Sequence, residues 1–240
     1  MLILLYLFAR ESTWFLPTVI AVVMAFACIL SLGILFTQVR YFYPATTKNK
    51  LGKVILTFDD GPDKHLTEKV LNILEKYNIK ALFFIIGEKA KNNPEILQKI
   101  YSNGHYIGNH TENHNVFFAM LSSKKIGKEI DDCSNTIKQI VGTETKLFRP
   151  PVGYMNPTIA RALKKRNLRL ISWNLRSFDT LLSSEKLLNR LLKKTKPGCV
   201  VLLHDNLSQS VQILEKYIQT CLSNGIIFAN QEDLKTFVCD

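Results

Sequence analysis

The pattern of apolar and polar positions divides the chain into an apolar N-terminal segment and a longer mixed region. Residues 12–39 contain no charged side chain, a run of 28 positions. The densest part of this run, residues 14–36, would be about 34 Å long as a helix, enough for the roughly 30 Å hydrocarbon core of a bilayer. Trp14 at one end and Tyr41 beyond the other are typical of membrane interfaces. We therefore predict one transmembrane helix, at about residues 14–36.

Two other interpretations of this segment fit less well. A buried helix of a soluble core rarely runs this long without a polar face. A cleaved signal peptide normally has a shorter apolar region, and no convincing small-x-small cleavage site follows this one. Residues 1–9 are also apolar, but they are too short to cross a bilayer alone. We expect residues 1–40 to form an uncleaved membrane anchor.

Beyond the anchor, strand-like apolar runs alternate with amphipathic helical stretches. Residues 41–52 are predicted to be a short polar linker. Predicted strands lie at 54–58, 81–86, 106–108, 146–148, 168–173, 200–203 and 226–229. Predicted helices lie at 66–77, 94–102, 123–141, 157–166, 184–194 and 208–223. This alternation predicts one α/β domain over residues 53–240 with a mainly parallel sheet, open or closed as a barrel, and a site at the carboxyl ends of the strands.

Composition narrows the classes of partner. Hydrophobic residues make up 47% of the chain, which is enough for a sizeable core. The net charge of +11 favours acidic partners such as anionic lipid or an anionic wall polymer. The basic residues are spread along the chain without interleaved aromatic residues, so nucleic-acid binding is not predicted. None of the five cysteines forms a C-x-x-C pair, so zinc-finger or dithiol redox chemistry has no support, while a disulfide among Cys133, Cys221 and Cys239 stays open.

Polar clusters follow two of the predicted strands. Asp59 and Asp60 follow the strand at 54–58. Burying two adjacent carboxylates there costs free energy unless something binds them. Taken by itself, this motif is also explained by a solvent-exposed turn. His110 and His114 follow the strand at 106–108. On one helical turn, histidines four apart face the same way and suit a single metal ion, but they could also be two unrelated surface residues. His65 belongs to no such pair, and neither does His105, so both are expected to be structural or exposed.

Three further polar residues follow other strands. Arg149 comes after 146–148 and can form a bidentate pair with a carboxylate. Asp179 comes after 168–173, and His204 ends the run at 200–203. His204 alone would be interpreted as a satisfied core residue. A separate structural explanation at each of five strand ends is less credible than one shared site. Two histidines and a carboxylate would leave positions for water on zinc, or on cobalt, manganese or iron, and such an ion lowers the pKa of water and polarises a carbonyl.

Four motifs together resemble one known family. They are T-F-D-D-G-P at 57–62, H-T-E-N-H at 110–114, R-P-P-V-G at 149–153 and L-L-H at 202–204. In this order and spacing they resemble the polysaccharide deacetylase family, the NodB-homology domain of carbohydrate esterase family four. The resemblance covers about residues 53–204. It implies a distorted (β/α) barrel and metal-dependent hydrolysis of acetyl groups on an amino-sugar polymer.

The resemblance also implies a role for each residue at the metal and the base. Asp60, His110 and His114 would be the metal ligands. Asp59 would be the general base that deprotonates the attacking water. Arg149 would keep Asp59 ionised, because an adjacent cation favours the carboxylate.

The resemblance places the remaining roles on the other side of the reacting bond. His204 would be the general acid that protonates the leaving amine, and Asp179 would keep its imidazole charged and oriented. The backbone N–H of Val152 would help to stabilise the oxyanion, and Leu202 would line the pocket for the acetyl methyl group.

Three positions depart from the family pattern. Val152 stands where an aromatic residue is usual, which matters little if only its backbone N–H is used. Thr180 replaces a common tryptophan, and Arg176 replaces a frequent acidic residue. The chemistry is therefore expected to follow the family, whereas the sugar subsite is expected to differ.

The expected function is hydrolysis of the acetamide of N-acetylglucosamine units, first in peptidoglycan because of the anchor, or in a chitin-like polymer. An O-acetyl polysaccharide esterase using the same site and a non-catalytic carbohydrate-binding protein on this fold are the alternatives. Lys48, Lys50 and Lys53 follow the span, and the positive-inside rule alone would keep the domain in the cytoplasm. A wall polymer lies outside, so we expect a single-pass membrane protein with an extracytoplasmic catalytic domain. The oligomeric state is left open.

Overall fold

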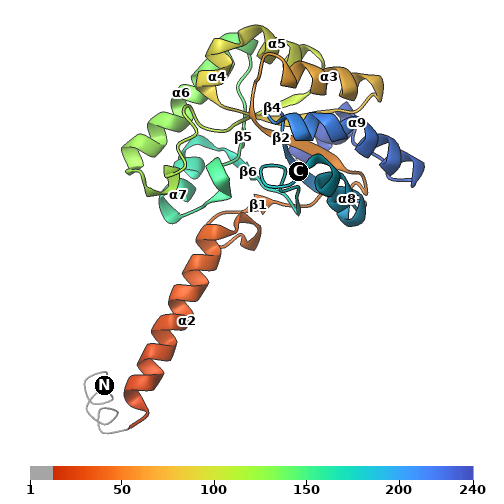
Figure 1. Ribbon diagram of the computed structural model, residues 1–240. Coiled ribbons are helices and arrows are strands. Elements are labelled where there is room, and N and C mark those ends of the chain that lie inside the picture. The colour runs from red at the N-terminus through yellow and green to blue at the C-terminus, as the bar shows by residue number, and fades with distance from the viewer. Residues whose placement is uncertain (1–12, 240) are drawn as a thin grey trace.

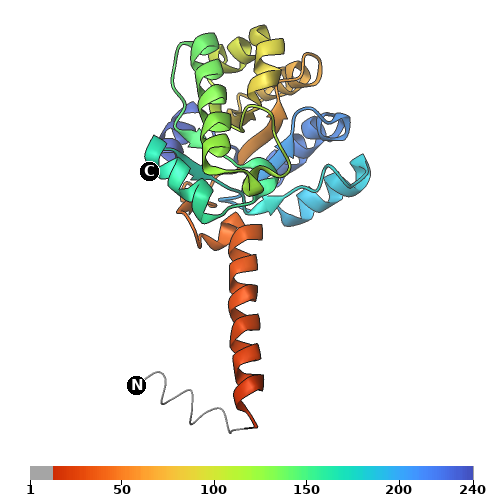
Figure 2. The same ribbon diagram turned by 90° about the vertical axis from the view of Figure 1, so that its left-hand side faces the viewer.

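A long apolar helix and a rounded α/β domain make up the computed structural model, which describes residues 13–239. The helix α2 (Phe15–Leu35) leaves the lower end of the domain as a straight rod (Figures 1 and 2). Among the described residues it is the one helix long and apolar enough to cross a membrane, a property that a signal sequence near the N-terminus shares. Pro17 lies in its first turn, where a missing N–H costs least. The apolar residues 1–9 lie outside the described residues.

The end of α2 is packed onto the domain. Gly33 is buried, and a Cβ at this position would lie 2.9 Å from the ring of Tyr41. The backbone N–H of Met155 donates to the carbonyl oxygen of Ile34 at 3.0 Å. A short helix, η1 (Thr37–Val39), follows, and β1 (Ala45–Thr46) then joins the sheet. Part of the segment expected to be a linker therefore belongs to the fold.

Within residues 13–239, the eight strands of the sheet all run parallel, in the order β1-β6-β5-β4-β3-β2-β8-β7. After β1 they are β2 (Ile55–Gly61), β3 (Ala81–Ile85), β4 (Tyr106–Asn109), β5 (Leu147–Phe148), β6 (Arg169–Ile171), β7 (Leu175–Arg176) and β8 (Val200–His204). The sheet is curled into a half-barrel, and helices surround it (Figure 1). The prediction of a distorted (β/α) barrel behind one apolar helix is confirmed. The predicted strand at 226–229 is wrong: among the described residues it makes one isolated bridge, between Val54 and Phe228.

The helices follow the periodicity of the sequence closely. They are α3 (Leu66–Lys76), α4 (Gly87–Asn92), α5 (Pro94–Ser102), α6 (Ser123–Val141), α7 (Pro157–Arg166), α8 (Ser184–Lys194), α9 (Ser208–Ser223) and α10 (Gln231–Cys239), with short turns η2 (Phe118–Met120) and η3 (Pro151–Gly153). Gly142 ends α6 with a φ of 75°, a left-handed conformation that glycine adopts without steric cost. The elements β1, β7 and α4 were beyond the predicted set, because two to six residues are too few to show a clear period. The helix α10 was not predicted either.

The alternation of side chains along the strands separates two hydrophobic layers. Phe83 and Ile85 of β3 pack outward against the helices, whereas Leu82 and Phe84 pack inside the curl with Ile55. A period of two along a strand produces this division. The five cysteines are all free thiols. Apolar side chains thus fill the inside of the curl, while the polar clusters lie at the carboxyl ends of the strands.

Candidate metal and acid–base site

The sequence-predicted polar residues meet at the carboxyl edge of the sheet. Asp59 on β2 pairs in register with His204 on β8. β4 ends directly before His110, and β5 ends directly before Arg149. Because parallel strands end at the same edge, residues far apart in sequence become neighbours there.

A bulge at Asp60 brings two consecutive carboxylates to one place. Side chains normally alternate between the faces of a strand, so Asp59 and Asp60 should point apart. The register of β2 against β3 shifts between Asp59 and Gly61, and Asp60 has a φ of 70°. As a result Asp59 Oδ2 lies 3.9 Å and Asp60 Oδ1 3.4 Å from the same nitrogen, His110 Nε2.

The two histidines are held by an irregular loop, and the expectation that they share a helical turn is wrong. Thr111 and His114 have positive φ values of 69° and 48°, which a right-handed helix excludes. The loop still brings the imidazole rings of His110 and His114 to a centroid distance of 4.9 Å. The irregular backbone of this loop, and not helical spacing, brings the two rings together.

The side chains of Asp60, His110 and His114 fit a bound cation. One ligand atom from each lies within 4.8 Å of the others. His110 Nδ1 lies 2.7 Å from the carbonyl oxygen of Arg149, which can only accept, so Nδ1 carries the proton and Nε2 presents a lone pair. Asp60 Oδ1 is buried without a hydrogen-bond partner among the described residues. Electron-pair donors that face one another in this way are suited to a positive charge between them.

Arg149 is fully buried and holds Asp59. Its Nη1 donates to Asp59 Oδ1 at 2.6 Å and to Thr57 Oγ1 at 2.9 Å. Nε and Nη2 donate to the carbonyl oxygens of Ile171 and Ser172 at 3.0 and 3.2 Å. Burial lowers the pKa of Arg149, and the charge of Asp59 opposes this effect. The contact uses one guanidinium nitrogen, so the pair is not bidentate as the sequence led us to expect.

His204 is held by Asp179 on the opposite side of the site. Its Nδ1 and the Asp179 Oδ1 atom are 2.8 Å apart, and the His204 backbone N–H donates to Asp179 Oδ2 at 2.8 Å. The hydroxyl of Ser210 donates to the same oxygen at 2.6 Å. Burial alone would lower the pKa of His204, but the hydrogen bond and charge of Asp179, with the nearby Asp59 and Asp60, raise it to about 9. The imidazole is thus protonated at neutral pH.

The loop after β5 is strained and closely packed. Val152 has a φ of 62° and a ψ of −11°, a conformation that is rare for a β-branched residue and costs roughly 1–3 kcal/mol. Gly153 follows with a φ of 84°, and a Cβ there would lie 2.4 Å from the ring of Trp173. Leu202, on β8, is buried and pairs in register with Thr57. Val152 and Leu202 therefore belong to the same edge of the sheet as the polar residues.

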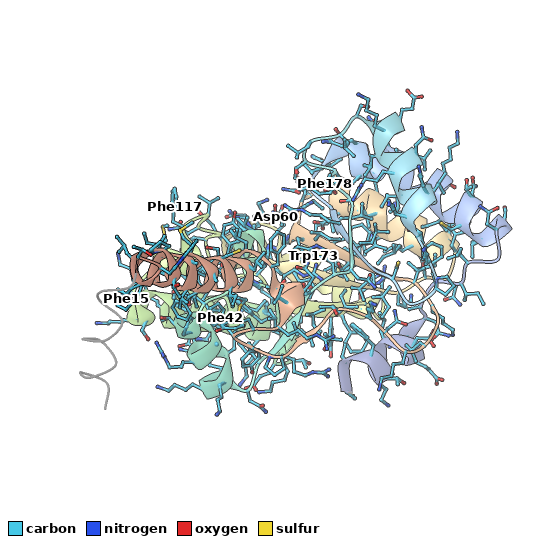
Figure 3. The ribbon with its side chains drawn as sticks, turned by 90° about the horizontal axis from the view of Figure 1, so that it is seen from below. Phe15, Phe42, Asp60, Phe117, Trp173 and Phe178 are labelled. Carbon is cyan, nitrogen blue, oxygen red and sulfur yellow. The ribbon has the colours of Figure 1, made fainter. Side chains whose placement is uncertain are left out.

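Aromatic side chains lie beside the two positions where the sugar subsite departs from the family pattern. Thr180 and Arg176 are exposed. The guanidinium of Arg176 lies 6.0 Å from the Trp173 ring centre and 5.3 Å from that of Phe178. Trp173, Phe178 and Asp60 are grouped in the view from below (Figure 3). Trp173 itself is buried, so Phe178 is the ring of the two that is partly exposed.

Some residues of the motifs and their surroundings lie outside this cluster. Glu112, inside H-T-E-N-H, is buried and forms an ion pair with Lys91. His105 is buried and accepts from the backbone N–H of Ala81, and His65 is exposed, as the sequence indicated for both. The hydroxyls of Thr57, Ser172 and Ser210 are functional neighbours that sequence reasoning missed. Only Thr57 had a signal, because it lies inside T-F-D-D-G-P.

Comparison with known proteins gives consistent matches. Residues 46–171 match the sequence model of a family described as polysaccharide deacetylase. A peptidoglycan-N-acetylglucosamine deacetylase of Bacillus cereus is 33% identical over 187 residues, which are 75% of this chain and 87% of that protein. A peptidoglycan-N-acetylmuramic acid deacetylase of Bacillus subtilis is 27% identical over 80% of this chain and 74% of that protein. The crystal structure of a peptidoglycan N-acetylglucosamine deacetylase in complex with 4-naphthalen-1-yl-N-oxidanyl-benzamide has a TM-score of 0.75 at 30% identity, covering 81% of this chain and 94% of that one.

Proposed function

The chain belongs to the polysaccharide deacetylase family, and we propose that it hydrolyses the acetamide of N-acetylglucosamine units in peptidoglycan. It is accordingly a hydrolase of carbon–nitrogen bonds other than peptide bonds. The observation that carries the proposal is the pairing of Asp59 with His204 across adjacent strands, beside the Asp60–His110–His114 cluster. A carboxylate and a protonated imidazole on two sides of one cation site suit hydrolysis by base and acid.

We assign the divalent metal to Asp60, His110 and His114. Two imidazoles and one carboxylate suit zinc first, and cobalt, manganese or iron next. When bound, the metal supplies activation of water and polarisation of the acetamide carbonyl. The proton on His110 Nδ1 is fixed by the Arg149 carbonyl oxygen, so this ring is already oriented to bind through Nε2.

Asp59 is assigned as the general base. Its Oδ1 is occupied by Arg149, whereas Oδ2 points toward His110 Nε2 at 3.9 Å. Oδ2 is therefore the oxygen placed to take the proton of the attacking water. The hydrogen bond from the buried guanidinium holds the carboxylate in this orientation.

His204 is assigned as the general acid. Its Nδ1 is held by Asp179, which leaves Nε2 to give a proton to the leaving amine. The backbone N–H of Val152 is assigned to the developing oxyanion, because this residue lies four positions beyond β5 in the loop that begins with Arg149. Leu202 is assigned to the wall around the acetyl methyl group.

One observation favours a second candidate substrate within the same polymer. N-acetylmuramic acid carries a carboxylate that N-acetylglucosamine lacks, and Arg176 is an exposed cation beside Trp173. A relative with this substrate in its name is 27% identical to the chain. An O-acetyl esterase activity would use the same residues. The alkoxide released from an ester needs less help to leave than the amine of an amide, so a site that hydrolyses the amide could also hydrolyse the ester. The non-catalytic alternative is disfavoured, since each assigned acid, base and ligand position carries a competent side chain.

We assign residues 1–40 to a membrane anchor and residues 53–240 to the catalytic domain. The apolar length of α2 and the wall substrates named for the relatives support a single-pass protein with its domain outside the cytoplasm. Lys48, Lys50 and Lys53 argue the other way under the positive-inside rule. A C-terminal reporter that is active only in the cytoplasm would overturn this orientation.

The experiment for the function is an acetate-release assay on the full chain in detergent. The panel contains N-acetylglucosamine oligomers, peptidoglycan fragments with N-acetylmuramic acid, and acetylated xylan. We expect release from the amino sugars, and Asp59→Asn should lose several orders of magnitude of turnover while keeping its metal. Glu215→Gln, on an exposed carboxylate, is the matched control. Near-normal turnover of Asp59→Asn would refute the assigned base, and release from xylan alone would refute the amide assignment.

A further inference from the structure

We propose that the loop at residues 116–120 rests on the lipid bilayer, so that the domain touches the membrane at a second point beside α2. The loop follows His114 and contains the turn η2. The proposal rests on α2 crossing the membrane, as proposed above, and does not depend on the proposed reaction.

The loop exposes large apolar side chains. Val116 is 55% exposed, Phe117 64% and Met120 83%. Each of these side chains is more stable out of water. Three such side chains lie within five residues of one loop, and clustered exposed apolar residues mark protein or membrane contacts.

The exposure is not a consequence of a poorly anchored loop. Phe118 lies between these residues, is 1% exposed and packs near Phe148 at a ring distance of 6.3 Å. The backbone N–H of Phe117 donates to Asn115 Oδ1 at 2.8 Å. The Asn156 amide donates to the carbonyl oxygen of Ala119 at 2.5 Å. The loop is therefore held in a shape that presents its apolar residues outward.

The position of the loop identifies the bilayer as its partner. Asn156, which binds the loop, follows Met155, whose N–H binds the carbonyl oxygen of Ile34 in the last turn of α2. If α2 crosses a membrane, its last turn lies at the lipid surface. The loop is linked to that turn through the adjacent residues Met155 and Asn156. In the view from below, Phe117 and α2 project onto the same side of the molecule (Figure 3). A second protein would have to displace the lipid that α2 itself brings to this surface.

The charge next to the loop is also suitable for a membrane. Lys124 and Lys125 are exposed at the start of α6, directly after the loop. Basic residues at a lipid surface are attracted by anionic headgroups. Apolar residues that insert, flanked by lysines that meet headgroups, are the pattern of an interfacial membrane contact. The same contact would fix the loop that carries His114 close to the membrane surface.

The test is lipid photolabelling of the full chain. The protein is placed in nanodiscs of phosphatidylethanolamine and phosphatidylglycerol with a trace of diazirine-bearing phospholipid, irradiated, digested and mapped by mass spectrometry. We expect residues 116–120 to be labelled several-fold more than α5, where Tyr101 is 45% exposed at the end of the domain far from α2 (Figures 1 and 2). The triple variant Val116→Ser, Phe117→Ser, Met120→Ser should lose this labelling, and Tyr101→Ser should leave it unchanged.

A second measurement does not depend on the triple variant folding. Phe117→Trp and Tyr101→Trp place an indole at each end of the domain, and their fluorescence is compared with that of the unaltered chain in vesicles of brominated phosphatidylcholine. We expect quenching of the added signal at 117 and none at 101. Equal labelling of the two segments, or no quenching at 117, would overturn the proposal.

Discussion

The hydroxyl oxygens of Thr37 and Ser172 lie 2.6 Å apart in a buried contact that joins η1, just after α2, to the α/β domain. The carbonyl oxygen of Ser172 accepts a hydrogen bond from Arg149 Nη2 at 3.2 Å. Arg149 in turn holds Asp59. Three contacts therefore connect Thr37, two residues beyond α2, with the carboxylate assigned as the base.

Thr37→Val should weaken this support. The variant keeps the shape but leaves the Ser172 hydroxyl buried without its partner, which costs roughly 1–3 kcal/mol. We expect lower stability in denaturant titrations and a several-fold lower kcat, with unchanged metal content. Thr37→Ser keeps the hydroxyl and should behave like the unaltered protein. Equal stability and turnover of Thr37→Val would show that the contact carries no energy.

Arg149→Met should destabilise the domain strongly. Removing one partner of a buried ion pair leaves an uncompensated charge, Asp59, at a cost of roughly 3–5 kcal/mol. The free energy of unfolding from denaturant titration measures this loss. Arg166→Met breaks the more exposed pair with Asp131 and should cost about 1 kcal/mol or less. Similar losses in the two variants would contradict the buried-pair argument.

The activity should fall at alkaline pH as His204 loses its proton. The pKa of His204 is raised to about 9, so its stabilising interaction with Asp179 is fully present below pH 6.5 and is lost as the pH rises through 9. Asp179→Asn removes the charge that opposes burial, and the alkaline limb of the kcat profile should move to lower pH. An NMR titration of the His204 ring reports the same shift independently of turnover. An unmoved limb in Asp179→Asn would remove His204 from the role of acid.

Metal removal should abolish activity reversibly. A chelator should stop acetate release, and zinc or cobalt should restore it. His114→Ala should lose bound metal in elemental analysis, because one of three protein ligands is gone. His65→Ala is the control, since this histidine is exposed and lies outside the cluster. Full metal occupancy in His114→Ala would exclude this residue as a ligand.

Much of the fold could be predicted from the sequence because its signals are local. Periods of two and of about 3.6 residues located the strands and helices, and apolar runs that end in polar pairs indicated the functional edge of the sheet. The unsuccessful predictions concern irregular backbone. Nothing local indicated that Thr111 and His114 would adopt positive φ, or that residues 226–229 would make only one bridge.

The amino-acid sequence by itself determined the family, the alternation of strands and helices, and the set of side chains at the carboxyl edge. The tertiary structure alone decided how those side chains face one another. The bulge at Asp60, the single-nitrogen contact of Arg149, and the hydroxyls of Ser172 and Thr37 depend on partners that are distant in the chain. Such contacts exist only after the sheet has curled. A parallel sheet brings together residues that are far apart in the sequence, and the local sequence around each residue does not indicate its partner.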